Sequence, residues 1–73
     1  ASIDDFLFIA DEFCRLTGLA ESTLSTRVLA DGKRISAIRR GADIGARRLG
    51  VAMEWFARHW PDGASWPTNV ARP

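Results

Sequence analysis

The residues with the most chemistry to offer lie in one short run, from Glu21 to Thr26. Four of the five positions from Ser22 to Thr26 are Ser or Thr, which are mediocre helix formers because their side chains compete for backbone hydrogen bonds. Short polar side chains on an exposed helix can reach the edges of base pairs in the major groove of DNA. We therefore predict base contacts from Glu21, Ser22, Ser25 and Thr26. A solvated helix face that is merely rich in hydroxyl groups is the alternative.

Charge is segregated along the chain, although the net charge is only +1. Residues 1–25 hold five acidic side chains and one basic, whereas residues 26–50 hold seven basic and two acidic. This asymmetry favours a polyanionic partner, because the local field attracts a phosphate backbone. The predicted phosphate contacts are Thr23 from the hydroxyl run, then Arg27, Lys33 and Arg34, then Arg39 and Arg40. Arg47 and Arg48 come last, because ordinary solvated helix charge explains them equally well.

Other kinds of chemistry lack the residues they need. His59 is the only histidine and Cys14 the only cysteine, so we expect no catalytic triad, four-ligand zinc site or intramolecular disulfide. The sequence therefore predicts no enzymatic activity, no metal and no cofactor. A lone cysteine favours a reducing, cytoplasmic setting, and no apolar run approaches the roughly 20 residues of a membrane span.

Hydrophobic spacing predicts the helices that position these residues. A first helix is expected to follow Ser2, whose pairing with Asp5 is typical of a capping box, and to end at Gly18. Its apolar residues recur at intervals of three and four and are Ile3, Phe6, Leu7, Ala10, Phe13 and Cys14. A second helix is expected over residues 20–29, with Leu24 and Val28 on its inner face.

The second half of the chain predicts two more helices and a tail. Asp31 and Gly32 indicate a turn, and a short helix containing Ile35 and Ile38 should end at Gly41. Asp43 is expected to cap a last helix that Pro61 terminates, with an apolar stripe of Leu49, Ala52, Met53, Phe56 and Trp60. Residues 1–61 then form one domain, and residues 62–73 form an irregular tail that Trp66 packs onto it. The expected fold class is all-α, a compact bundle of about four helices.

Residues 10–29 resemble the helix-turn-helix of the lambda-repressor-like family. The resemblance rests on the small Cys14 four positions before the turn residue Gly18, on Leu19 directly after the glycine, and on Leu24 in the following helix. Cys14 replaces the usual alanine, and Arg27 stands where the family often has an apolar residue. The resemblance implies sequence-specific binding of double-stranded DNA, with helix 20–29 as the recognition helix. It also implies a transcriptional regulator, more typically a repressor of the phage or plasmid type.

The number of copies is a separate expectation. One recognition helix reads only a few base pairs, so two copies are expected on DNA. Val51 and Trp55 lie about one helical turn apart and are the candidate homodimer surface, although a helix buried on two sides explains them equally well. The competing function is a helical protein-interaction module without DNA binding, which uses Val51, Trp55 and Trp66 or the acidic first helix.

Overall fold

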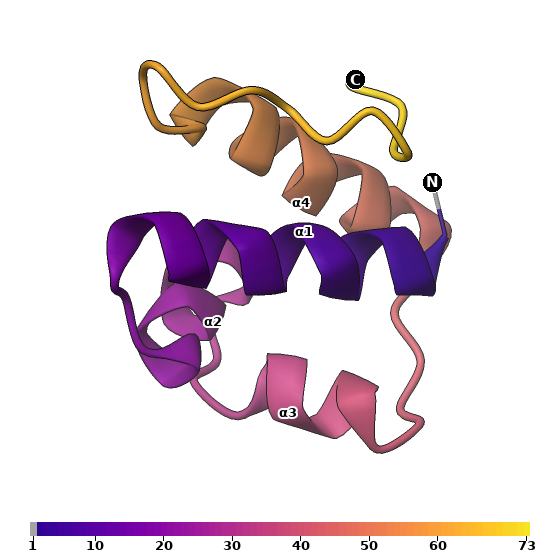
Figure 1. Cartoon of the computed structure of the whole chain (residues 1–73). Helices are drawn as coiled ribbons and strands as arrows, with labels where there is room; N and C mark the ends of the chain where they lie inside the picture. The colour runs from indigo at the N-terminus through magenta and orange to yellow at the C-terminus, as the bar shows by residue number, and fades with distance from the viewer. Residues whose placement is uncertain (1) are drawn as a thin grey trace.

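Local signals at both ends define the first helix. The computed structural model describes residues 2–73, and its helix α1 spans Ile3–Thr17 (Figure 1). The Ser2 hydroxyl accepts a hydrogen bond from the Asp5 amide at 3.1 Å, and the Asp5 carboxylate accepts one from the Ser2 amide at 3.3 Å. The predicted capping box is therefore confirmed. Gly18 ends the helix with φ 75°, a left-handed conformation that glycine adopts without steric penalty.

The second and third helices are short and are joined by a tight turn. Helix α2 spans Glu21–Leu29 and helix α3 spans Arg34–Arg39, close to the predicted ranges. In the turn between them, the Asp31 carboxylate accepts a hydrogen bond from the Lys33 amide at 2.9 Å. Figure 1 shows α2 and α3 on one side of α1 and most of the last helix on the other.

The last helix, α4, spans Ala46–His59 and ends directly before Trp60 and Pro61, as predicted. The prediction that Asp43 caps it is wrong, because the residue at the cap is Gly45, two positions later. The backbone oxygen of Asp43 instead accepts a hydrogen bond from the Arg34 guanidinium at 2.6 Å. Ile44 is buried, so the chain is anchored to the core directly before α4 begins.

The core is built around aromatic residues that join α1 to α4. Phe6 and Phe13 both contact Phe56, with ring centroids 5.9 and 5.5 Å apart. Leu24 of α2 and Ile35 of α3 are fully buried, so all four helices contribute. The other buried apolar residues are Ile9, Ala10, Leu29, Ile38, Ile44, Leu49, Ala52, Met53, Trp60 and Val70. The fold is the expected compact all-α bundle, and Ile9 and Ile44 are core residues that the periodicity did not single out.

The tail that follows α4 is irregular and packs back onto the domain, as predicted. Trp66 lies against Trp60 with ring centroids 4.9 Å apart, and its indole N–H donates to the Val70 oxygen at 2.9 Å. The Arg72 guanidinium lies 5.3 Å from the centre of the Trp66 ring and donates to the Ala57 oxygen at 2.8 Å. These contacts hold the tail along α4, which it follows in Figure 1.

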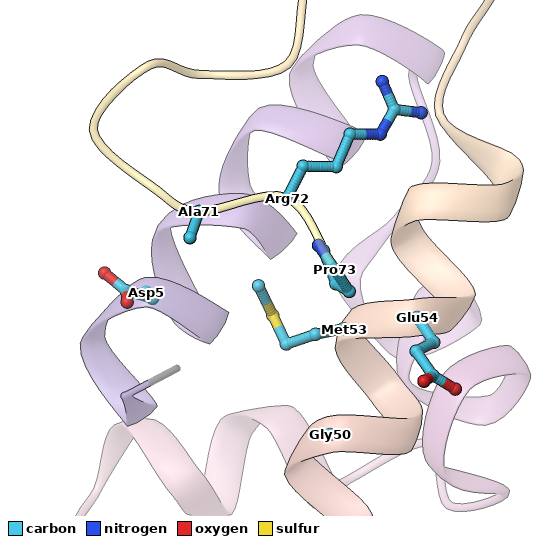
Figure 2. Close-up of a pocket in the computed structure, with 7 residues that line it drawn as sticks. All are labelled: Asp5, Gly50, Met53, Glu54, Ala71, Arg72 and Pro73. Carbon is cyan, nitrogen blue, oxygen red and sulfur yellow. The ribbon is translucent and has the colours of Figure 1, made fainter.

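The end of the tail also lines a small pocket against α1 and α4. The pocket has a volume of about 260 Å³ and is lined by Asp5, Gly50, Met53, Glu54, Ala71, Arg72 and Pro73 (Figure 2). The Arg72 side chain extends away from Met53 in this view. Carboxylates and a guanidinium both border the pocket, so its charge favours no ligand of one sign.

Candidate nucleic-acid interface

The outer face of α2 carries the short polar side chains that the sequence singled out. Ser22, Thr23, Thr26 and Arg27 are all exposed, and intervals of three and four residues keep them on one side of the helix. The Thr26 hydroxyl donates to the Ser22 backbone oxygen at 3.1 Å, which leaves the hydroxyl oxygen able to accept a further hydrogen bond. Ser22, Thr23 and Thr26 therefore form the exposed hydroxyl face of α2.

Ser25 does not belong to this face, and its predicted role as a base contact is corrected. The residue is fully buried, its hydroxyl donates to the Asp31 backbone oxygen, and it accepts from the Ile35 amide at 3.0 Å. Ser25 follows the buried Leu24 and precedes Leu29 by one helical turn, which places it on the inner stripe of α2. The four-residue spacing between Ser25 and the apolar Leu29 was the sequence signal that could have indicated the burial of Ser25. The hydroxyl ties the interior of α2 to the first turn of α3.

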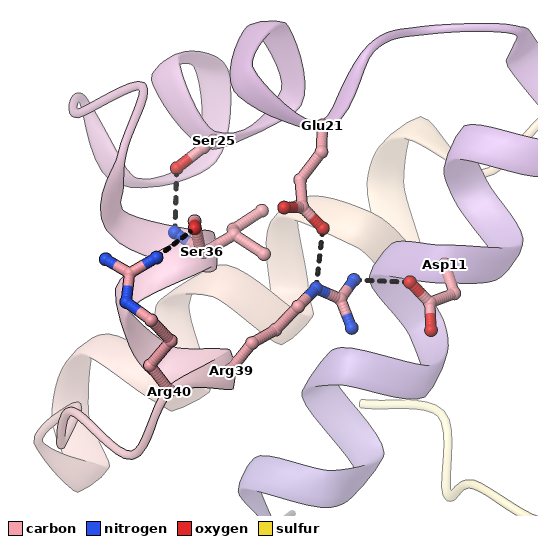
Figure 3. A network of polar contacts seen from close by, with 7 residues as sticks. Asp11, Glu21, Ser25, Ser36, Arg39 and Arg40 are labelled. Atoms are coloured by element: carbon pink, nitrogen blue, oxygen red, sulfur yellow. Dashed lines mark hydrogen bonds and ion pairs between the residues drawn. The ribbon is translucent and has the colours of Figure 1, made fainter.

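Glu21 is held by an arginine rather than standing free at the start of α2. The Arg39 Nε donates to the Glu21 carboxylate at 2.6 Å, and a second nitrogen of the same guanidinium pairs with Asp11 of α1 (Figure 3). Burial acts to lower the pKa of Arg39, but hydrogen bonds and charge from Asp11 and Glu21 outweigh it and raise the pKa. One guanidinium thus links α1, α2 and α3. Glu21 and Arg39 thus each have a partner within the chain, and their predicted roles as a base contact and a phosphate contact stay predictions.

Two more of the predicted phosphate contacts have local partners. Arg34 donates to the Asp43 backbone oxygen at 2.6 Å. Arg40 donates to the Ser36 hydroxyl at 2.6 Å, as Figure 3 shows. Both hydrogen bonds hold the region around α3 in place. Lys33 precedes α3 and is exposed, so its ammonium group remains accessible.

The arginines closest to the outer face of α2 border a groove between α2 and α4. The groove has a volume of about 340 Å³ and is lined by Arg27, Val28, Leu29, Ala30, Arg47, Arg48 and Val51, a set we call the arginine groove. Across residues 2–73, the ion pairs engage Arg15 and Arg39 and none of the three arginines of the groove. Sequence reasoning ranked Arg47 and Arg48 last, because ordinary solvated helix charge explained them equally well. The packing of α4 on α2, which the sequence does not reveal, places them in one groove with Arg27.

The proposed homodimer surface divides into one exposed and one packed residue. Val51 is 58% exposed. Trp55 is partly buried, with its ring centroid 5.5 Å from that of Phe13 and 5.4 Å from that of Phe56, and it stacks on His59 at 4.3 Å. Trp55 therefore belongs to the aromatic cluster of the core. Of the two residues, Val51 alone offers a largely open apolar surface.

Cys14 lies close to the ion-pair network of Arg39. Burial raises the pKa of its thiol above the ordinary value, the charges of Glu21 and Asp11 raise it further, and Arg39 acts in the opposite direction. A thiol of this kind is protonated at neutral pH and is a poor nucleophile. Within residues 2–73, no group of three His, Cys, Asp or Glu side chains has the arrangement of a metal site.

Comparisons with models of protein families, with curated proteins and with solved structures find no match to this chain. The residues themselves therefore carry the functional inference. None of the helices in the described part of the chain combines the length and hydrophobicity of a membrane span.

Proposed function

We propose that this domain binds double-stranded DNA, with the outer face of α2 in the major groove. The observation that carries the proposal is the adjacency of two surfaces: the exposed hydroxyl face of α2 and the arginine groove, which share the exposed Arg27. Ser22 and Thr26 have the size and hydrogen-bonding groups for base edges, and the Thr26 methyl suits the methyl group of thymine. The resemblance to lambda-repressor-like proteins adds the expectation of a transcriptional regulator, most simply a repressor.

The cations around α2 supply the phosphate contacts in this proposal. Arg27, Arg47, Arg48 and the exposed Lys33 carry charges that no carboxylate of the described residues neutralises within ion-pair distance. Half or more of the hydrogen bonds in protein–DNA complexes go to phosphate and sugar, and they position the protein on the duplex. Four such contacts give a slope of roughly −3 to −4 in a plot of log affinity against log salt.

Paired occupancy of an operator is a further part of the proposal. A single α2 reads only a few base pairs, so two copies on an inverted repeat, with half-site centres roughly 34 Å apart, give the specificity that one copy lacks. The stoichiometry of the complex on a selected duplex measures this directly. Binding of one copy to the shortest selected site would remove paired occupancy while leaving DNA binding intact.

The experiment is a selection from randomised duplexes followed by salt titration of the selected site. Thr26→Ala and Ser22→Ala should change which sequences are preferred, whereas Arg48→Gln should weaken binding to every duplex and lower the salt slope by about one unit. Arg58→Gln is the matched control, because Arg58 is exposed in the last turn of α4, about ten residues or 15 Å from Arg48 along the helix. If no duplex is enriched, or if both kinds of variant act equally on all sequences, the proposal fails.

A further inference from the structure

Two of the exposed large apolar side chains lie at the centres of oppositely charged surfaces. Phe8 is 41% exposed on α1, and Val51 is 58% exposed on α4, where it lines the arginine groove. Both side chains are exposed in a single copy of the chain, so neither surface covers the other within that copy. Only a second molecule could bury them.

The surroundings of Phe8 are acidic on every side along the helix. On a helical surface the neighbours of a residue lie three and four positions away. For Phe8 these positions hold Asp4, Asp5, Asp11 and Glu12, which together with Phe8 we call the acidic patch. Asp11 pairs with Arg39 and Glu12 with Arg15, so the end of the patch near the start of α1 carries the least compensated negative charge.

The surroundings of Val51 are the complement of this arrangement. Arg47 and Arg48 lie four and three positions before Val51 on α4, and Arg27 faces them across the groove from α2. The other residues that line the groove are the apolar Val28, Leu29 and Ala30. An aromatic side chain flanked by carboxylates is therefore complementary to a groove flanked by guanidinium groups, which pair with carboxylates in bidentate geometry.

We propose that the acidic patch of one copy docks into the arginine groove of another copy, with Phe8 against Val51. Electrostatic complementarity of this kind fixes the orientation of partners and excludes pairing of like surfaces. Groove-to-groove and patch-to-patch contacts both bring like charges together, so the contact joins unlike surfaces of the two copies.

This contact also regulates the proposed DNA binding. Arg27, Arg47 and Arg48 are the phosphate contacts proposed above, and a docked acidic patch covers them, so the second copy and the duplex compete for one site. The competition rests on the proposed function. The self-association does not, because it is measured without DNA.

The test uses two variants that each break one side of the contact. Phe8→Gln replaces the aromatic ring at the centre of the acidic patch with glutamine, which is a good helix former. Val51→Glu places a carboxylate beside Arg47 and Arg48 in the groove. Leu16→Gln is the matched control, because Leu16 is a third exposed apolar residue, 37% exposed and two turns along α1 from Phe8. Circular dichroism verifies that each variant is folded before sedimentation is measured.

Sedimentation velocity from about 10 µM to 1 mM covers the affinity expected of a small contact. The native chain and Leu16→Gln should associate, less strongly in high salt. Phe8→Gln and Val51→Glu should each weaken association about tenfold or more, and their equimolar mixture should form a heterodimer through its one intact contact. A monomeric native chain, association of Phe8→Gln alone that is as strong as that of the native chain, or a mixture that associates no more strongly than either variant alone would each overturn the proposal.

Addition of duplex DNA separates this proposal from the proposed function. If both hold, an excess of a short duplex that carries a single half-site dissociates the native pair, and Phe8→Gln binds this duplex more tightly than the native chain at concentrations where the native chain associates. If the chain associates but binds no duplex, DNA binding fails and self-association stands. If duplex binds and the native pair persists on it, the competition is wrong.

Discussion

The backbone amide of Ile35 donates a hydrogen bond of 3.0 Å to the hydroxyl of Ser25, in the fully buried space between α2 and α3. The same hydroxyl donates to the Asp31 backbone oxygen, so one small side chain satisfies one polar group of the connecting turn and one of the first turn of α3. A buried polar group without a partner is costly, which makes Ser25 a structural residue inside a run of surface hydroxyls.

Ser25→Ala should therefore destabilise the fold by about 1–3 kcal/mol, because the Ile35 amide loses its partner in a buried site. The free energy of unfolding from urea denaturation measures the change. Ser22→Ala, on the exposed face of the same helix, is the control and should change stability by no more than about 0.5 kcal/mol. Equal stabilities of the two variants would show that the buried hydrogen bonds contribute nothing net.

Ala30 ends α2 in the left-handed region, with φ 58° and ψ 25°. That conformation costs a non-glycine residue about 1–2 kcal/mol. Glycine avoids this cost, but part of the gain is lost because glycine has more conformational freedom in the unfolded chain. Ala30→Gly should raise the free energy of unfolding by about 0.5–1 kcal/mol. Ala57→Gly, inside α4, should lower it by about the same amount, since its backbone is helical. Destabilisation by Ala30→Gly would contradict the account of this helix end.

The reactivity of Cys14 should follow the charges around it. Because burial and the carboxylates raise the pKa of the thiol above 9.0, the rate of alkylation by iodoacetamide should reach its midpoint above pH 9.0. Glu21→Gln should move the midpoint down and Arg39→Gln should move it up, because the two side chains act in opposite directions on the thiolate. A midpoint that neither variant moves would show that the network of Figure 3 does not act on this thiol.

Trp55→Lys should destabilise the fold by about 2–4 kcal/mol, because it removes aromatic contacts with Phe13 and Phe56. Val51→Lys, one turn earlier on α4 and largely exposed, should stay within about 0.5 kcal/mol of the native chain. Thermal unfolding followed by circular dichroism compares the two. A Trp55→Lys variant as stable as the native chain would contradict the core role of Trp55 and favour its role in an interaction surface.

The helix boundaries were predictable where the chain signals them locally. Ser2 with Asp5, Gly18 and Pro61 act through neighbouring backbone groups, so sequence alone located both ends of α1 and the end of α4. The start of α4 was missed because burial of Ile44, a tertiary contact, anchors the chain there.

The candidate site was predictable only in part, for the same reason. Whether Ser25 faces solvent depends on where α3 packs, and whether Arg39 is free depends on Asp11, which lies 28 residues earlier in the chain. Arg47 and Arg48 gained importance only when α4 was placed beside Arg27. Residue type indicated the chemistry, and long-range packing decided which residues are available for it.

The distribution of tryptophan has a spectroscopic consequence. Trp55 lies in the second half of α4, and Trp60 and Trp66 lie after it. Tilted ring contacts join Trp55 and Trp60 to Phe13 and Trp60 to Trp66, and Trp55 stacks on His59. No tryptophan or tyrosine lies on α2 or α3. Intrinsic emission is therefore a built-in probe of the aromatic half of the molecule, and a label on α2 is needed to follow events at the opposite end.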